Sequence, residues 1–94
     1  RGDAAVAKAE ALKLLEKTVR ETGATQAFIE TPYRNSSMLA AICETVSGVS
    51  LCAAQNLGSA NERIVSKPVR EWSAAARERF AGKEPTLFLL GVPQ

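Results

Sequence analysis

Helical patterns alternate with short apolar runs along this chain, and that alternation limits the folds open to it. Apolar residues recur at helical spacing from Val6 to Val19, and Gly23 is a typical helix end. The run TQAFIET that follows has the length and composition of a buried strand, and Pro32 ends it. Because helices and apolar strands continue to alternate downstream, we expect an α/β protein.

The remaining elements follow from the same periods. We expect a helix over 35–48, strands over 49–54 and 63–66, a helix over 68–82 and an interior strand over 85–92. The first two strands are joined through a helix, which predicts a right-handed parallel crossover. The short link between the second and third strands predicts an antiparallel pair. The predicted fold is therefore an α/β domain with a mixed, mostly parallel sheet of about four strands flanked by helices.

Composition narrows the classes of function. The 94 residues suit one small domain, and a net charge of +2 is too small to indicate a nucleic-acid partner by itself. The sequence has no histidine, the commonest general base and zinc ligand, so we expect no metal site. It has no apolar stretch of membrane-spanning length. We interpret Cys43 and Cys52 as reduced thiols of a cytoplasmic protein, with a disulfide as the alternative.

Two polar clusters follow apolar strands. They are the stretches ETPYRN (30–35) and QNLGS (55–59). In α/β sheets, ligands bind at the carboxyl ends of strands, so both clusters are candidates for one site if their strands are parallel neighbours. The alternative is structural. Thr31 and Pro32 then form a turn, Asn35 caps a helix, Glu30 and Arg34 form a surface ion pair, and the second cluster is a loop with positive φ angles.

The same stretches carry a resemblance to a known family. The strings QAFIETPYRN, LCAAQNLGSANERIVSKPVREW and PTLFLLG, in this order and spacing, resemble the C-terminal half of the tetrapyrrole (corrin/porphyrin) methylases. These are two-domain, S-adenosylmethionine-dependent methyltransferases, and the family includes the bacterial 16S rRNA ribose methyltransferase. The resemblance covers nearly the whole chain. It implies that residues 1–94 are the C-terminal domain, and that the N-terminal domain with its glycine-rich cofactor segment is not among them.

The resemblance also implies a site. Its cofactor would be S-adenosylmethionine, bound between the two domains, with no metal. Tyr33 and Arg34 would face the acceptor substrate or the domain seam. The residues that would contact the cofactor are Glu30, Thr31, Ala54, Asn56 and Leu57. No catalytic residue is assigned.

The methyl acceptor stays open between a tetrapyrrole and an rRNA nucleotide. The rRNA branch usually has an arginine, an acid, a threonine and a histidine–acid pair after the second strand, whereas this chain has AAQNLGSANERI and keeps only Glu62 in the acid position. The implied partner is the enzyme's own N-terminal domain, and a homodimer is left open. These residues alone are expected to be inactive. The alternative function is a free-standing module that binds a small anionic or nucleotide ligand.

Overall fold

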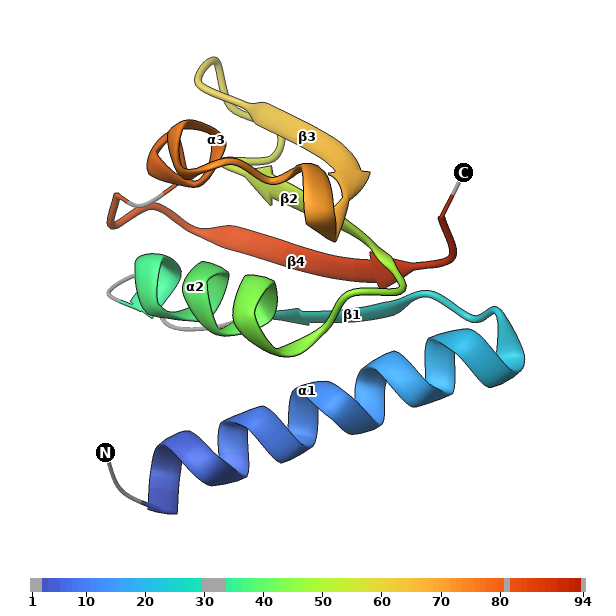
Figure 1. Ribbon diagram of the computed structural model, residues 1–94. Coiled ribbons are helices and arrows are strands. Elements are labelled where there is room, and N and C mark those ends of the chain that lie inside the picture. Colours follow the sequence, from blue (N-terminus) through green and yellow to red (C-terminus); the bar gives the residue numbers. More distant parts are fainter. Residues whose placement is uncertain (1–2, 30–33, 81, 94) are drawn as a thin grey trace.

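The protein is described here from a computed structural model that places residues 3–29, 34–80 and 82–93. Its elements follow one another along the chain (Figure 1). In order they are α1 (Asp3–Thr22), β1 (Gln26–Ile29), α2 (Asn35–Thr45), β2 (Ser50–Gln55), β3 (Arg63–Pro68), the 3-10 helix η2 (Val69–Glu71), α3 (Ala74–Glu78) and β4 (Thr86–Gly91). The first two helices and the four strands therefore occur where the sequence predicts them.

The sheet has the order β1-β4-β2-β3, and every neighbouring pair is antiparallel. The prediction of a mixed, mostly parallel sheet is therefore wrong. Both β1 and β2 run antiparallel to β4, so they point the same way, but β4 lies between them and they share no hydrogen bonds. The predicted β2–β3 antiparallel pair and the interior position of the last strand are confirmed.

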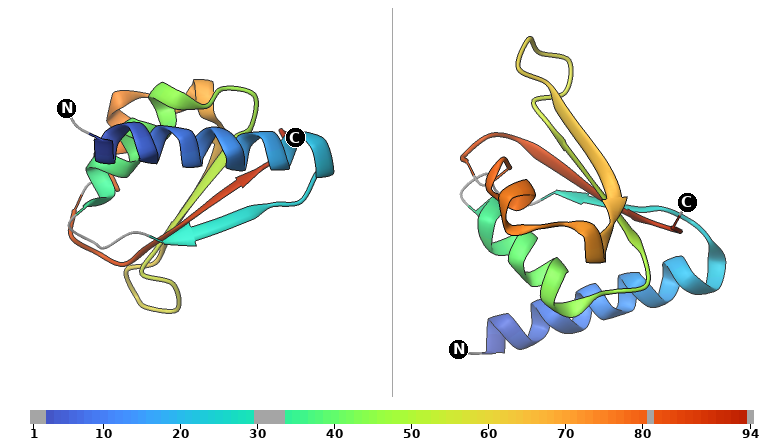
Figure 2. Two further views of the ribbon diagram at one scale, coloured as in Figure 1. Left: turned by 90° about the horizontal axis from the view of Figure 1, so that it is seen from below. Right: turned by 45° about the horizontal axis from the view of Figure 1, so that its top comes forward.

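The helices gather on one face of the sheet, and the other face is left uncovered (Figure 2). The side chains of the strands alternate accordingly. Phe28, Phe88 and Ala53 are register partners on the helix-covered side, where Phe88 and Ala53 are completely buried. The next row of partners, Ile29, Leu87 and Ala54, therefore faces the uncovered side. Because Ile29 is 75% exposed, this side carries apolar side chains that no helix of the described chain covers.

The predicted third helix over 68–82 is wrong as a single element. Pro68 still belongs to β3, and Trp72 is extended between η2 and α3. The buried Trp72 indole N–H donates to the carbonyls of Leu51 and Lys67, at 3.1 and 3.2 Å. The Ser73 hydroxyl then accepts from the N–H of Ala76 and caps α3. Anchoring the indole to the strands therefore interrupts the helical backbone.

A buried carboxylate joins α1 to the turn after α2. Glu16 accepts hydrogen bonds from the N–H groups of Ser47 and Gly48, at 3.0 and 3.1 Å, and lies within 4 Å of Lys13 and Arg20. Burial acts to raise the pKa of Glu16, but the two backbone donors and the two cations outweigh it. The pKa is therefore lowered from its ordinary value of 4.5.

This pairing predicts an acid-sensitive contribution to stability. Because the folded-state pKa of Glu16 is below the unfolded one, its contribution is complete above about pH 4.5 and is lost as the pH falls through the folded value. Glu16→Ala should lower the free energy of unfolding at pH 7 by about 1–3 kcal/mol, since the N–H groups of Ser47 and Gly48 lose their buried acceptor. Urea unfolding at pH 7 and pH 3 measures this. The exposed Glu10→Ala on the same helix is the control, and equal losses in both variants would contradict the prediction.

Candidate functional site

The carboxyl ends of β1 and β2 meet at one rim of the sheet. Ile29, the last residue of β1, is the register partner of Leu87 near the start of β4, and Leu87 is also the partner of Ala54 near the end of β2. The two polar clusters of the sequence therefore follow strands that end at the same rim but are not neighbours as predicted, because β4 lies between them. Glu30, Thr31 and Tyr33, predicted to bind cofactor or acceptor, lie outside the described residues.

An open pocket of about 520 Å³ lies at this rim, on the uncovered side of the sheet. Three predicted cofactor-binding residues, Ala54, Asn56 and Leu57, are part of its lining. No charged residue lines it among the described parts of the chain. The lining consists of Ile29, Ala54, Asn56, Leu57, Ser59, Pro85, Thr86 and Leu87. Apolar walls with a few polar atoms are typical of sites that bind small organic molecules.

Asn56 is tied into the protein at the edge of this pocket. Its backbone has a positive φ of 56°, which asparagine tolerates better than most residues. Its N–H donates to the carbonyl of Pro85 at 3.0 Å, and its side-chain amide donates to the Glu84 carboxylate. The N–H and hydroxyl of Ser59 both donate to the Asn56 carbonyl. These hydrogen bonds attach the turn at Asn56 to the segment before β4. Asn56 therefore fixes the shape of the pocket as well as lining it.

The hairpin loop beyond Asn56 closes on itself. Gly58 has a positive φ of 82°, and its N–H donates to the Glu62 carboxylate at 2.9 Å. The structural alternative for this cluster, a loop with positive φ angles, is therefore confirmed. The loop nevertheless presents Leu57 to the pocket, with 54% of that residue exposed. The interpretation as a loop and the interpretation as part of a ligand site are compatible, because the turn positions Leu57 at the pocket.

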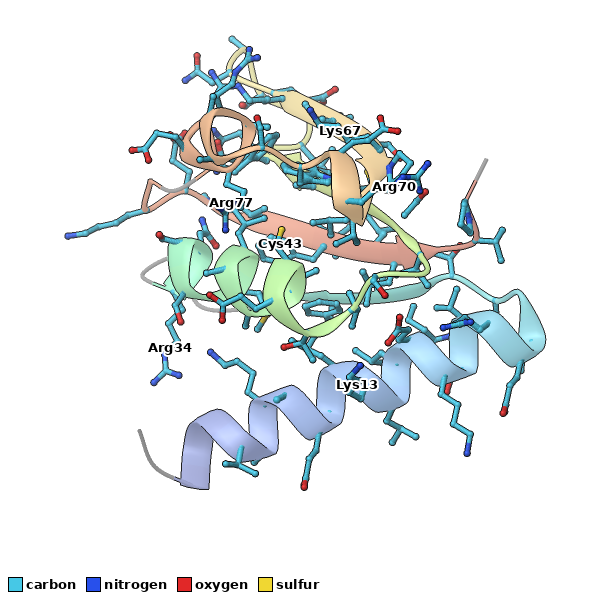
Figure 3. All side chains as sticks on the ribbon, in the orientation of Figure 1. Lys13, Arg34, Cys43, Lys67, Arg70 and Arg77 are labelled. Atoms are coloured by element: carbon cyan, nitrogen blue, oxygen red, sulfur yellow. The ribbon has the colours of Figure 1, made fainter. Side chains whose placement is uncertain are left out.

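Arg34 does not line the pocket. It precedes α2 and is exposed, and its side chain points away from the central strand β4 in Figure 3. The ion pair suggested between Arg34 and Glu30 concerns a residue outside the described parts. Tyr33, the other residue predicted to face the acceptor, lies outside the described residues.

A buried polar network lies beneath the rim. Two of its residues belong to the polar clusters of the sequence, but no ligand contact was predicted for them. The network consists of Asn35, Gln55 and Thr86, all at most 4% exposed. Asn35 was predicted to cap its helix, but its side-chain amide donates to the segment before β4 instead. Its Oδ1 is buried without a hydrogen-bond partner in the described structure. In the sequence, only the polar residue types indicate this network, because the spacing of residues does not give the direction of a side chain.

The two cysteines are free thiols on different sides of the sheet. Cys52 shares its register row with Ala27 and Leu89, on the uncovered side, whereas Cys43 belongs to α2 and packs against the core from the helix side (Figure 3). Burial raises the pKa of both thiols, so they are mostly protonated at neutral pH. The prediction of reduced cysteines agrees with this arrangement, and neither has the character of a nucleophile.

The described residues contain no group of three or more acidic, cysteine or histidine side chains arranged to hold a metal ion. None of the helices in the described part of the chain is long and apolar enough to cross a membrane.

No protein-family model matches this sequence, and a search of curated proteins finds no match. The resemblance to the tetrapyrrole methylases therefore stays a prediction that depends on the sequence strings quoted above.

Proposed function

We propose that this chain is the C-terminal domain of an S-adenosylmethionine-dependent methyltransferase and forms one wall of the donor site. The observation that carries the proposal is the meeting of the β1 and β2 ends at one pocket. Residues predicted from the sequence strings to contact the cofactor, Ala54, Asn56 and Leu57, occur together in its lining. The acceptor, a tetrapyrrole or an rRNA nucleotide, would approach from the side of Tyr33 and Arg34.

The chemistry of methyl transfer suits such a wall. The reaction is an in-line displacement at the sulfonium methyl group, in which the protein mainly positions donor and acceptor and excludes water. A lining without charged side chains can cover the flat, uncharged part of the donor. The apolar contacts come from Leu57 and Leu87, and polar atoms of Asn56 and Ser59 lie at the edge. The partner domain would supply the glycine-rich segment for the rest of the cofactor.

A non-catalytic binding module is the second candidate. One observation favours it: no side chain with an acid–base function lines the pocket in the described structure. Such a module would bind a small anionic or nucleotide ligand without turning it over. The two candidates differ in the ligand that binds best and not in the position of the site.

Ligand titration followed by NMR separates the two functions. The methyltransferase proposal predicts that S-adenosylhomocysteine binds the chain with a dissociation constant of about 1 mM, a free energy near −4 kcal/mol, because only one wall is present. ATP should bind at least about tenfold more weakly. Labelled S-adenosylmethionine with porphyrinogen or ribosomal acceptors should give no methylated product from this chain alone. Tighter binding of ATP, or turnover by the chain, would contradict the proposal.

A further inference from the structure

Asn35 is completely buried at the first residue of α2, yet its side chain serves another part of the chain. The two hydrogens of its Nδ2 are shared among three acceptors, the carbonyls of Gly82 and Glu84, at 3.0 and 2.7 Å, and the Thr86 hydroxyl at 3.0 Å. A capping asparagine would accept from its own helix through its oxygen. This side chain instead fixes the segment 82–86, which leads from the α3 region into β4 and supplies Pro85 and Thr86 to the pocket.

Thr86 gives this contact a fixed geometry. Its hydroxyl accepts from the side-chain amides of Asn35 and Gln55, each at 3.0 Å, and donates to the Glu84 carbonyl at 2.9 Å. One donor and two acceptor positions are all that a hydroxyl has. The Glu84 carbonyl likewise accepts two hydrogen bonds, from Asn35 and Thr86. All three positions of the Thr86 hydroxyl are therefore used inside this network, which favours one arrangement of the segment, whereas the Oδ1 of Asn35 has no partner in the described structure.

The opposite side of the same segment holds the edge of the pocket. The Glu84 carboxylate accepts from the Asn56 side-chain amide, and the Pro85 carbonyl accepts from the Asn56 N–H. Segment 82–86 is thus fastened by Asn35 from the buried side and fastens Asn56 on the pocket side. A displacement of this segment would move both attachments of Asn56, and with them the turn that carries Leu57.

We propose that Asn35 is a positioning residue for the pocket. It acts through segment 82–86 on Asn56, and touches no ligand itself. The inference rests on the proposed function only for the identity of the ligand, because the hydrogen bonds themselves do not depend on it. Asn35, the last residue of the ETPYRN cluster, thus has a role at the rim that differs from the predicted helix cap.

NMR spectra of the Asn56 side-chain amide at constant pH test this coupling. Glu84→Ala removes the carboxylate that accepts from this amide and gives the reference change in its resonances. Asn35→Leu keeps a side chain of similar size without donors. It should move the Asn56 amide resonances in the same direction, by at least about half of the reference change, and weaken S-adenosylhomocysteine binding about threefold, since a buried hydrogen-bonded anchor is lost. Asn61→Leu, at an exposed asparagine of the same hairpin loop, should change neither.

A second variant covers the case in which Asn35→Leu does not fold. Thr86→Val keeps the shape of the side chain and removes the hydroxyl that Asn35 and Gln55 share, so it should move the Asn56 amide resonances in the same direction as Asn35→Leu. Unchanged Asn56 amide resonances in the folded variants would overturn the inference. If the unmodified chain binds no S-adenosylhomocysteine but the Asn56 amide resonances change as expected, the proposed function fails and the role of Asn35 stands.

Discussion

Replacing Phe88 with alanine is expected to lower the free energy of unfolding by about 3–5 kcal/mol. Phe88 is completely buried in the interior strand β4, and its ring stacks on Phe28 with centroids 5.7 Å apart. The variant leaves a cavity under the helices. β4 cannot move to close it, because it is hydrogen-bonded to β1 and β2 on its two edges. A 94-residue domain has a stability of roughly 5–14 kcal/mol at typical values per residue. A large part of the total would therefore be lost.

The control for this variant lies one residue further along the paired strand. Ile29 is 75% exposed on the uncovered side, so Ile29→Ala should cost less than about 1 kcal/mol. Denaturant unfolding of both variants measures the difference. Similar losses for Phe88→Ala and Ile29→Ala would contradict the assignment of the two sides of the sheet, and with it the location of the pocket on the uncovered side.

Replacing Leu57 with serine is expected to weaken S-adenosylhomocysteine binding by about tenfold or more. Leu57 is half exposed in the free protein and would be covered by the ligand. Covering that area contributes about 1 kcal/mol, and desolvating the new hydroxyl costs about 0.5–2 kcal/mol. A tenfold change corresponds to about 1.4 kcal/mol. Stability should change by no more than about 0.5 kcal/mol, because the residue lies in an exposed turn.

The matched control for this variant is Leu14→Ser. Leu14 is a leucine of similar exposure, 63%, on α1, and it does not line the pocket. The ligand titrations are run on both variants beside thermal melts. The proposal fails if Leu57→Ser binds as tightly as the unmodified chain, or if Leu14→Ser weakens binding equally.

The elements of this fold could be predicted because their signals are local. The apolar period of α1 and its end at Gly23 are properties of a short window, and the Gly23 N–H does close the helix on the Val19 carbonyl at 2.8 Å. The pairing of strands is not local. The insertion of β4 between β1 and β2 depends on contacts between residues 31–64 positions apart, such as Phe28 with Phe88. The local pattern of strand, helix and strand over β1, α2 and β2 predicts a parallel crossover, and it contains no signal that β4 lies between the two strands.

The site was predictable to the same degree. Polar residues at two strand ends predicted a shared rim on the condition that the strands are parallel neighbours. That condition is not met, because β4 lies between β1 and β2, although both strands point the same way and end at the same rim. The directions of side chains could not be predicted. Asn35 fits the composition of a cap, but burial against segment 82–86 turns its amide away from its own helix. Trp72 fits a helical face, but its indole N–H is satisfied by strand carbonyls, which breaks the helix there.

The central claim is that the pocket at the ends of β1 and β2 holds the methyl donor. The most direct measurement is a set of intermolecular nuclear Overhauser effects between S-adenosylhomocysteine and the methyl groups of the isotope-labelled chain. The account predicts contacts from the adenosyl protons to Leu57, Leu87 and Ile29, all of which line the pocket. Contacts to Leu89 and Val92 in the second depression of the same side, or no contacts at saturating ligand, would contradict it.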